Sequence, residues 1–431
     1  MDNTDELIHN NDIIINDSTV IPDPYEGFPV MICYRRIFTL MVCLLLMTEA
    51  AGGSADMKEV EDMNTAVLTR SGEGTRFENG FRAEIGPVRV LDLHGTWYGM
   101  GRQYGFLLKS ELRDVVSFVE DIIMVSPDNE SAAVEIRNRL VGQMPAEVRG
   151  FFVGAAETSG LTGEQLFYAN GVEYIAGLPA CSAMAFWKDY SAGGLVFGRN
   201  YDYGDSFLRL NNDVVVTVFH PDGDSPSAAI IGYAGEIYAV NGFNEAGLFL
   251  ELNNGTPSTG MPADTSRVCG TTGLFETLFR ADSLDSLDSF FQATLCDDSY
   301  IINATDAREA RSYEWSQIGV KRADQYTPEG LLASTNHYVH PDWPWPVPDD
   351  ARSWNSITRL EHLLNLAEAN KGRITAERMC ELLDLNLADG GVTDELTVYQ
   401  MVVEPENMKL RLKITGACDW TLIDLGSFLR E

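Results

Sequence analysis

A cysteine at the start of a strand-like run is the feature of this sequence best suited to chemistry. Cys181 follows Ala180 and opens a run that alternates in the way typical of a β-strand. After a Gly-Gly turn, a second strand-like run ends in the residues GRNYD at positions 198–202. We expect a hairpin that brings Arg199 and Asp202 back to the end of the sheet where the thiol begins.

A thiol nucleophile needs a base that takes its proton and donors that bind the oxyanion. Two kinds of base are open. One is a histidine, with His337 or His340 as candidates among six histidines, although the local signature of papain-like cysteines is missing. The other is a free α-amine, which titrates near ~8. That amine exists only if the chain is cut between Ala180 and Cys181.

Residues 180–202 resemble the N-terminal-nucleophile (Ntn) hydrolases of the choloylglycine hydrolase and penicillin-acyltransferase (peptidase family C45) type. Those families have a nucleophilic cysteine followed at a similar distance by a G-[RQ]-N-x-D run. The resemblance extends over about residues 85–425, with the further motifs in the same order. These are residues 95–101 (with Gly99 in place of the usual acid), 241–248 (like GxNExGL), Leu252-Asn253, 335–337 (like TN) and 356–359 (like SxxR).

The resemblance implies an α+β fold, a four-layer αββα sandwich of the Ntn-hydrolase type that follows a mostly helical pro-region. It also implies that the Cys181 thiol attacks the Ala180 carbonyl and that water then cuts the chain. The new α-amine acts as the base, and a thioester forms with the acyl part of a linear amide. A small N-acyl amide is the implied substrate, and the acyl group leaves to water or to another amine.

The resemblance assigns further roles residue by residue. Asp202 holds the α-amine, and Arg199 and Arg359 stabilise the surroundings of the nucleophile. Asn253 and Asn336 bind the oxyanion or orient the amine, with Asn254 as the alternative by one residue. The predicted catalytic residues are Cys181, Arg199, Asp202, Asn253, Asn336 and Arg359.

The charge balance limits the partners. The 431 residues include 64 acidic and 31 basic ones, a formal net charge of −33. Nucleic acids and anionic membrane surfaces require a basic footprint, so we expect neither as a partner. No CxxC or Cys/His ligand spacing occurs, so we expect no structural zinc site and no cofactor. Four further cysteines are either buried thiols or, in an exported chain, paired: Cys269, Cys296, Cys380 and Cys418.

The sequence divides into five predicted segments. Residues 1–30 form an acidic, disordered extension, which is outside the protein if translation starts at Met31. Residues 31–55 have the order of a secretory signal, two arginines before an apolar run and then small residues; an internal apolar helix is the alternative. A linker over 56–83, a helical pro-region or α chain over 84–180 and a catalytic β chain over 181–431 follow. We therefore expect a secreted protein whose two chains stay associated, without a permanent membrane span.

Periodicity predicts the elements that position these residues. Helices are expected at 98–125, 131–143, 145–158, 271–281, 285–294, 355–368 and 375–387, with a short helix opened by a Thr162–Gln165 capping box. Strands are expected at 88–93, 213–220, 227–233, 236–241, 247–253, 299–304, 311–315, 397–403 and 409–414.

Two other functions remain open on the sequence. One is a secreted binding protein that keeps this fold without catalysis. The other is a Cys-His hydrolase that does not cut itself. The mass of the purified chain separates self-cleavage from both.

Overall fold

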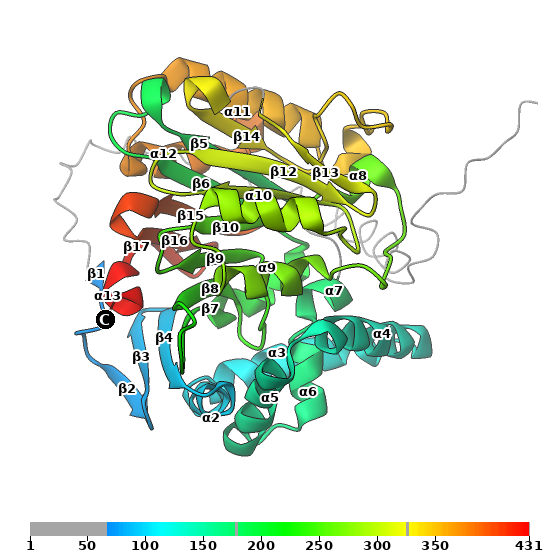
Figure 1. Cartoon of the computed structure of the whole chain (residues 1–431), viewed down its shortest axis with the longest axis vertical. Helices are drawn as coiled ribbons and strands as arrows, with labels where there is room; N and C mark the ends of the chain where they lie inside the picture. Colours follow the sequence, from blue (N-terminus) through cyan, green and yellow to red (C-terminus); the bar gives the residue numbers. More distant parts are fainter. Residues whose placement is uncertain (1–66, 177–179, 325–326, 431) are drawn as a thin grey trace, which may run out of the picture. The chain divides into compact units, whose positions relative to one another are not determined.

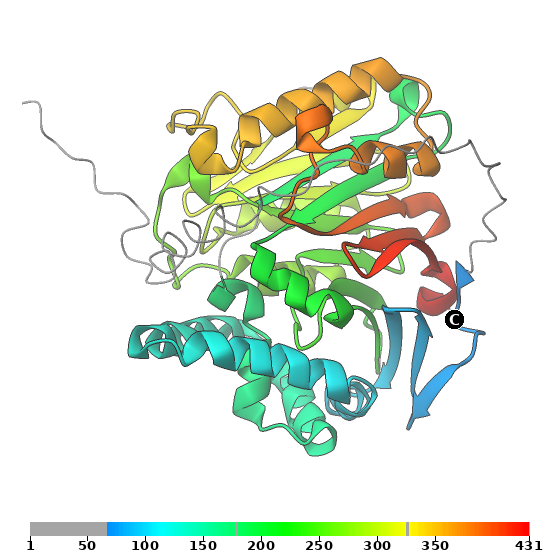
Figure 2. The same ribbon diagram turned by 180° about the vertical axis from the view of Figure 1, so that it is seen from behind.

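The computed structural model in Figures 1 and 2 describes residues 67–176, 180–324 and 327–430. The predicted extension and signal segment lie outside the described residues. Within the described ranges, none of the helices is both long and apolar enough to cross a bilayer.

The structure is built on two β-sheets. The first has seven strands in the order β1 (Val67–Leu68), β17 (Cys418–Asp424), β16 (Lys409–Ile414), β15 (Thr397–Glu404), β6 (Val196–Asp202), β5 (Ala180–Phe186) and β14 (Leu331–Ser334). The second has ten, in the order β13 (Gly319–Arg322), β12 (Ala310–Ser316), β11 (Tyr300–Thr305), β10 (Phe249–Asn254), β9 (Asn241–Asn244), β8 (Ala228–Tyr233), β7 (Val214–Pro221), β4 (Val88–Gly95), β3 (Gly80–Ile85) and β2 (Gly74–Phe77).

Helices cover the outer face of each sheet. Helices α11 (Ser356–Asn370) and α12 (Ala376–Leu383) pack on the seven-stranded sheet. Helices α2 (Trp97–Leu107), α9 (Gly270–Leu278) and α10 (Leu284–Ala293) pack on the ten-stranded sheet, and β10 and β12 contact β5 and β14 across the interior (Figure 1). The four-layer αββα sandwich predicted from the sequence is confirmed.

The remaining helices lie mainly before the cysteine in the chain. They are α3 (Lys109–Ile123), α4 (Pro127–Gln143), α5 (Ala146–Ser159), α6 (Gly163–Ala169) and α7 (Val172–Ala176), followed later by α8 (Thr256–Thr259) and α13 (Gly426–Leu429). The single helix predicted for 98–125 is two helices, because the backbone leaves helical geometry at Leu108 (φ −114°, ψ 25°). The capping box of Thr162 and Gln165 is confirmed at the start of α6.

Small residues let α2 and α5 approach each other closely. A Cβ atom added to Gly101 would lie 2.0 Å from the Phe151 carbonyl oxygen, and one added to Gly154 would lie 2.1 Å from the Tyr98 carbonyl oxygen. Glycine is therefore required at this crossing, where any side chain would separate the helices.

The predicted hairpin forms the centre of the seven-stranded sheet. Strands β5 and β6 are antiparallel, with Cys181 opposite Tyr201 and Ala183 opposite Arg199. Because successive side chains alternate between faces, Cys181, Arg199 and Tyr201 point between the two sheets. Ser182 and the apolar residues of the other face point toward α11 and α12.

Two sequence predictions are wrong in detail. Residues 67–83, predicted as linker, form β1, β2 and part of β3, because polar, glycine-rich runs are compatible with edge strands. Residues 236–240 of a predicted strand form a loop instead. Gly235 has a φ of 103°, and the Glu236 carboxylate accepts a hydrogen bond from the Tyr233 backbone at 2.8 Å, so the chain turns there. Strand β13 was not predicted.

Candidate active site

Cys181 lies at the start of β5 and is fully buried. Its Sγ is 3.2 Å from Nη2 of Arg199. Its backbone N–H donates to Oδ1 of Asn336 at 2.9 Å. The residue that would become a free amine therefore has a cation at its thiol and an amide oxygen at its nitrogen.

Arg359 joins the groups around this backbone. Its Nη1 donates to the Cys181 carbonyl at 2.6 Å and to Oγ of Ser182 at 2.7 Å, while Nη2 donates to Oδ1 of Asn336 at 2.6 Å. The Asn336 oxygen thus accepts from both Arg359 and the Cys181 N–H. These contacts hold the peptide on the carboxyl side of the expected cut in one position.

Backbone strain lies directly before α11. Trp354 and Asn355 have φ angles of 55° and 56°, in the left-handed region. Such a conformation costs on the order of 1–3 kcal/mol for a residue other than glycine and clusters at functional sites. The Trp354 carbonyl accepts from Nε of Arg359 at 3.0 Å, so the strained turn directs the guanidinium toward Cys181.

Arg199 is buried between the two sheets and is held by the neighbouring backbone. Its Nε is 3.3 Å from a carboxylate oxygen of Glu251. Its hydrogen-bond acceptors besides the sulfur are the carbonyls of Leu252 (2.6 Å) and Val240 (2.8 Å) and the Asn241 side chain. These three acceptors and the Glu251 carboxylate fix the guanidinium, so its position beside the sulfur is set by β10, the start of β9 and the loop before it.

Asp202 lies opposite Ala180, the residue before the expected cut. Its Oδ1 accepts from Oγ1 of Thr397 at 2.7 Å, and its Oδ2 is 3.9 Å from Nη1 of Arg359. Burial raises the pKa of this carboxyl to about 7, although Arg359 favours its ionised form. Near neutral pH the group can therefore take up or release a proton.

The structure distinguishes the two adjacent asparagines. Asn253 donates from Nδ2 to Oγ of Ser334 at 3.1 Å. Asn254 accepts from Nδ2 of Asn336 at its backbone carbonyl, at 2.9 Å. Nδ2 of Asn254 is buried and has no hydrogen-bond partner among the described residues. The contact with Asn336 therefore belongs to the alternative residue, and the oxyanion role of Asn253 stays a prediction.

The thiol is neutral in the uncut chain. Burial raises the pKa of Cys181 to about 11, and the nearby Arg199 offsets this only in part. Because the thiolate is the nucleophilic form, the buried thiol needs a base before it can react with a substrate.

The two candidate histidines make their contacts elsewhere. Nδ1 of His337 is 2.7 Å from Oγ of Ser356, and Nδ1 of His340 accepts from the Asp342 backbone at 3.2 Å. Burial lowers the pKa of His337 to about 4, and Arg359 lowers it further. Neither imidazole is the hydrogen-bond partner of the Cys181 sulfur in the described part of the chain.

A buried group of carboxyls and tyrosines beside Cys181 was not predicted from the sequence. Glu173, on α7, accepts from the hydroxyls of Tyr201 and Tyr238, and Tyr238 also lies 2.8 Å from Glu236. Burial raises the pKa of Glu173 to about 7 and that of Glu236 well above its ordinary value. The segment before Cys181 therefore contributes a carboxyl next to Tyr201, the residue that pairs with Cys181 across the hairpin.

The buried carboxyls predict how stability depends on pH. Burial raises the pKa of Asp202, Glu173 and Glu314 to about 7, so the folded state holds protons that the unfolded state releases near ~4. Their contribution is complete below about pH 4 and is lost as the pH rises through about 7. His337 acts in the opposite sense between about pH 4 and pH 6.5, but it is a single group, and the pKa values of Glu251 and Asp213 are also raised to about 7 by burial.

We expect urea unfolding of the uncut Cys181→Ala chain to give a larger free energy at about pH 5.5 than at about pH 8. The Glu173→Gln variant should show a smaller difference, because it lacks one of the titrating groups. A free energy that rises between these two pH values would contradict the buried carboxyls.

Neither of two surface cavities of the described residues reaches Cys181, which is fully buried. These cavities, one beside α9 and one between α4 and α6, are lined by residues other than those of the site. All five cysteines of the described ranges are free thiols: Cys181, Cys269, Cys296, Cys380 and Cys418.

The fold and the site define a layered αββα protein with a thiol at the start of an inner strand. No family model matches the chain, and no curated protein matches it. Among solved structures, it is similar to an N-acylethanolamine-hydrolyzing acid amidase ortholog of Caenorhabditis elegans. The identity is 18% and the TM-score 0.38, over 52% of this chain and 93% of that one.

Two bacterial structures are similar to about the same degree. A variant of the conjugated bile acid hydrolase of Clostridium perfringens has 13% identity and a TM-score of 0.40, over 57% of this chain and 92% of that one. The penicillin V acylase of Agrobacterium tumefaciens has 11% identity and a TM-score of 0.39, over 58% and 88%. At these identities, the activity of this chain has to be argued from its own residues.

Proposed function

We propose that this protein is a self-cleaving cysteine hydrolase of the N-terminal-nucleophile type. It cleaves linear amide bonds of N-acyl substrates, or transfers their acyl group to an amine, through a thioester on Cys181. The observation that carries the proposal is the hydrogen bond from the Cys181 N–H to Asn336, shared with Arg359. A free amine at this position keeps the same acceptor after the chain is cut.

The first reaction is cleavage of the chain itself. Sγ of Cys181 attacks the Ala180 carbonyl carbon, a C–S bond forms, and the C–N bond breaks with a proton passing to the nitrogen. Water then hydrolyses this thioester, which leaves a carboxylate on Ala180 and a free amine and thiol on Cys181. During both steps Arg359 and Asn336 hold the nitrogen and carbonyl of Cys181.

The second reaction is turnover of a substrate. The amine accepts the thiol proton, the thiolate attacks the substrate carbonyl, and the amine returns the proton to the leaving nitrogen. Water or a second amine then resolves the thioester. The side-chain amide of Asn254, or of Asn253, is the proposed oxyanion donor. One such donor lowers the activation free energy by on the order of 3 kcal/mol.

Both chains would remain together after cleavage. Strand β4, which precedes the cut, pairs in parallel with β7, which follows it, over residues 89–95 and 215–221. Strand β1 pairs in the same way with β17. We further propose that the segment at 31–55 directs export, because two arginines, an apolar run and then small residues follow one another there.

The test is the mass of the purified protein after incubation. We expect two fragments that elute together, with the second beginning at Cys181. One intact chain after prolonged incubation would contradict self-cleavage and favour a binding protein. Cleavage and activity retained in a His337→Gln, His340→Gln double variant would exclude a Cys-His hydrolase.

Assaying the cut protein against a panel of N-acyl amines should identify its substrate. The names of the similar structures supply its first members: an N-acylethanolamine, a conjugated bile acid and penicillin V. The product mixture with and without an added amine separates hydrolysis from acyl transfer.

A further inference from the structure

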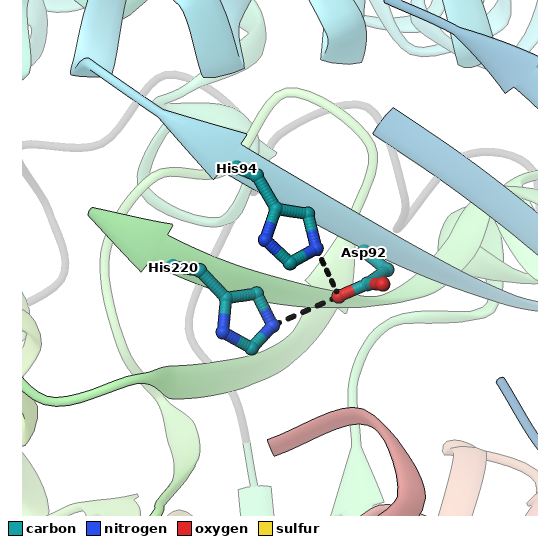
Figure 3. Close-up of side chains that lie close together, drawn as sticks. All are labelled: Asp92, His94 and His220. Carbon is teal, nitrogen blue, oxygen red and sulfur yellow. Dashed lines mark hydrogen bonds and ion pairs between the residues drawn. The ribbon is translucent and has the colours of Figure 1, made fainter. Parts of the chain in front are cut away.

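Three side chains of the kinds that bind metal ions converge on the ten-stranded sheet, apart from Cys181. Asp92 and His94 are two residues apart on β4, so they share a face of the sheet. His220 lies on β7, directly opposite His94 in the parallel register. Figure 3 shows the three side chains turned toward one another.

Their ligand atoms are close together. Oδ1 of Asp92 is 2.8 Å from Nε2 of His220 and 3.1 Å from Nε2 of His94, and all three atoms lie within 4.8 Å of one another. The two imidazole rings are parallel, with centroids 4.2 Å apart. The carboxylate is buried, whereas the histidine side chains are 19% and 9% exposed, so the imidazoles reach the surface.

Nε2 of His94 lies beside two groups that require opposite protonation states of this nitrogen. This nitrogen is also 3.1 Å from Nη2 of Arg70, which can only donate. Toward Arg70 the nitrogen should present its lone pair, and toward Asp92 it should present a proton. One imidazole nitrogen cannot do both, whereas a cation between the three ligands accepts a lone pair from each.

We propose that Asp92, His94 and His220 form a binding site for a divalent metal ion of the zinc class. Two imidazoles and one carboxylate are a typical set of three protein ligands that leaves a further position open. Nδ1 of His220 is 2.8 Å from Oγ of Ser227. The Ser227 hydroxyl can accept from Nδ1–H, and in that tautomer Nε2 presents its lone pair to a metal.

Arg70 is the natural competitor of the ion. Its Nε is 2.7 Å from Oδ2 of Asp92, and its side chain is one-third exposed, which lets it swing outward. Its positive charge opposes a second cation at this carboxylate. Removing that charge should therefore strengthen metal binding, whereas it would weaken a network made only of hydrogen bonds.

The site joins two parts of the chain. Asp92 and His94 precede Cys181, and His220 follows it, so the ion ties β4 to β7 whether or not the chain is cut. If the proposed self-cleavage takes place, the ion links the two resulting chains. No short Cys/His spacing marks this site in the sequence, because its ligands come from two distant segments.

The test uses the full-length, uncut Cys181→Ala chain, with Zn²⁺ as the probe in calorimetric titration and Co²⁺ in visible absorption. We expect one ion per chain. The affinity should fall more than about 100-fold in His220→Ala and in Asp92→Asn, since losing a ligand exceeds the about 10- to 100-fold cost of losing a group that only orients one. Ser227→Ala should cost about 10-fold.

Two matched variants sharpen the result. His362→Gln removes a histidine on α11 and should leave the affinity unchanged, while Arg70→Gln should raise it. Thermal unfolding with chelator shows whether each variant folds. Saturating Zn²⁺ should then raise the midpoint of the parent chain but leave that of His220→Ala unchanged.

The proposal is overturned if the folded parent chain binds no Zn²⁺, or if it binds Zn²⁺ equally well after His220→Ala. It is also overturned if Arg70→Gln weakens binding. Because every chain in this experiment is uncut, its outcome is independent of self-cleavage at Cys181.

Discussion

Replacing Cys181 by alanine is expected to leave one uncut chain without amide-cleaving activity. Both proposed reactions form a bond to the same sulfur, so a methyl side chain removes both. Loss of a nucleophile in comparable sites lowers turnover by on the order of 10⁴- to 10⁶-fold. Intact mass and a substrate panel measure the two effects separately.

Serine at position 181 is expected to retain slow self-cleavage. A hydroxyl can attack the Ala180 carbonyl in the same geometry, and Arg199 and Arg359 remain to hold the site. Its turnover should nevertheless fall, because a hydroxyl is a weak nucleophile at its ordinary pKa and the neighbouring amine has to activate it fully. A time course by mass spectrometry resolves slow cleavage from none.

Cys418→Ser is the matched control for these variants. Cys418 is a half-buried thiol on β17, so the substitution removes a sulfur without disturbing the site. It should cut and turn over like the parent protein. Cleavage between Ala180 and Cys181 in the Cys181→Ala chain would show that another group performs it, and the proposed mechanism would fail.

Local patterns were sufficient to predict the hairpin and most of the helices. Alternation on both sides of a Gly-Gly pair predicted the hairpin, because the side-chain period of a strand is two. The structure adds its register, in which Cys181 pairs with Tyr201. The order of the family-like motifs also predicted that Asn336 and Arg359, which lie far along the chain, belong to the site. In the structure both contact the backbone of Cys181.

A one-residue ambiguity in a strand cannot be resolved from its own sequence. Positions 253 and 254 are both asparagine, yet side chains at adjacent positions of β10 point to opposite faces. Only the packing of β10 against β14 and the turn before α8 shows which asparagine meets Ser334 and which meets Asn336. The contacts of each asparagine therefore depend on tertiary structure.

Buried carboxyls also escape prediction from sequence. Glu173 lies on a short helix and Glu236 in a loop, where acidic residues are usually solvated. Glu173 contacts Tyr201 of β6 and Tyr238 of the loop, two tyrosines from other segments, and Glu236 contacts the same Tyr238. The cluster of Asp92, His94 and His220 is similar, because the parallel pairing of β4 with β7 spans a long helical segment and the whole hairpin.

Replacing Arg359 by methionine is expected to prevent self-cleavage and to destabilise the fold. The guanidinium satisfies the Cys181 carbonyl, Ser182 and Asn336 in a buried site. Removing it takes one donor from each of these groups, although Asn336 keeps the Cys181 N–H, and leaves Asp202 without its nearby positive charge. Breaking a buried interaction of this kind typically costs about 3–5 kcal/mol, which urea unfolding of the uncut chain measures.

Arg359→Lys separates position from charge. A lysine keeps the positive charge near Asp202, but one ammonium cannot reproduce the planar fork that reaches the Cys181 carbonyl and Asn336 together. We therefore expect this variant to recover part of the lost stability while self-cleavage stays slow. Cleavage at the parental rate in Arg359→Lys would show that the fork is not needed to position the peptide.

Arg308→Met provides the control for removing an arginine. Arg308 lies in the turn between β11 and β12, where its side chain is 86% exposed and pairs with Asp306. Exposed ion pairs contribute about 0–1 kcal/mol, so this variant should unfold and cut nearly like the parent protein. If Arg359 only stabilised the fold, its methionine variant would still cut normally under conditions where it is fully folded. Slow cleavage in a folded Arg359→Met chain instead requires that the guanidinium hold the Cys181 peptide for attack.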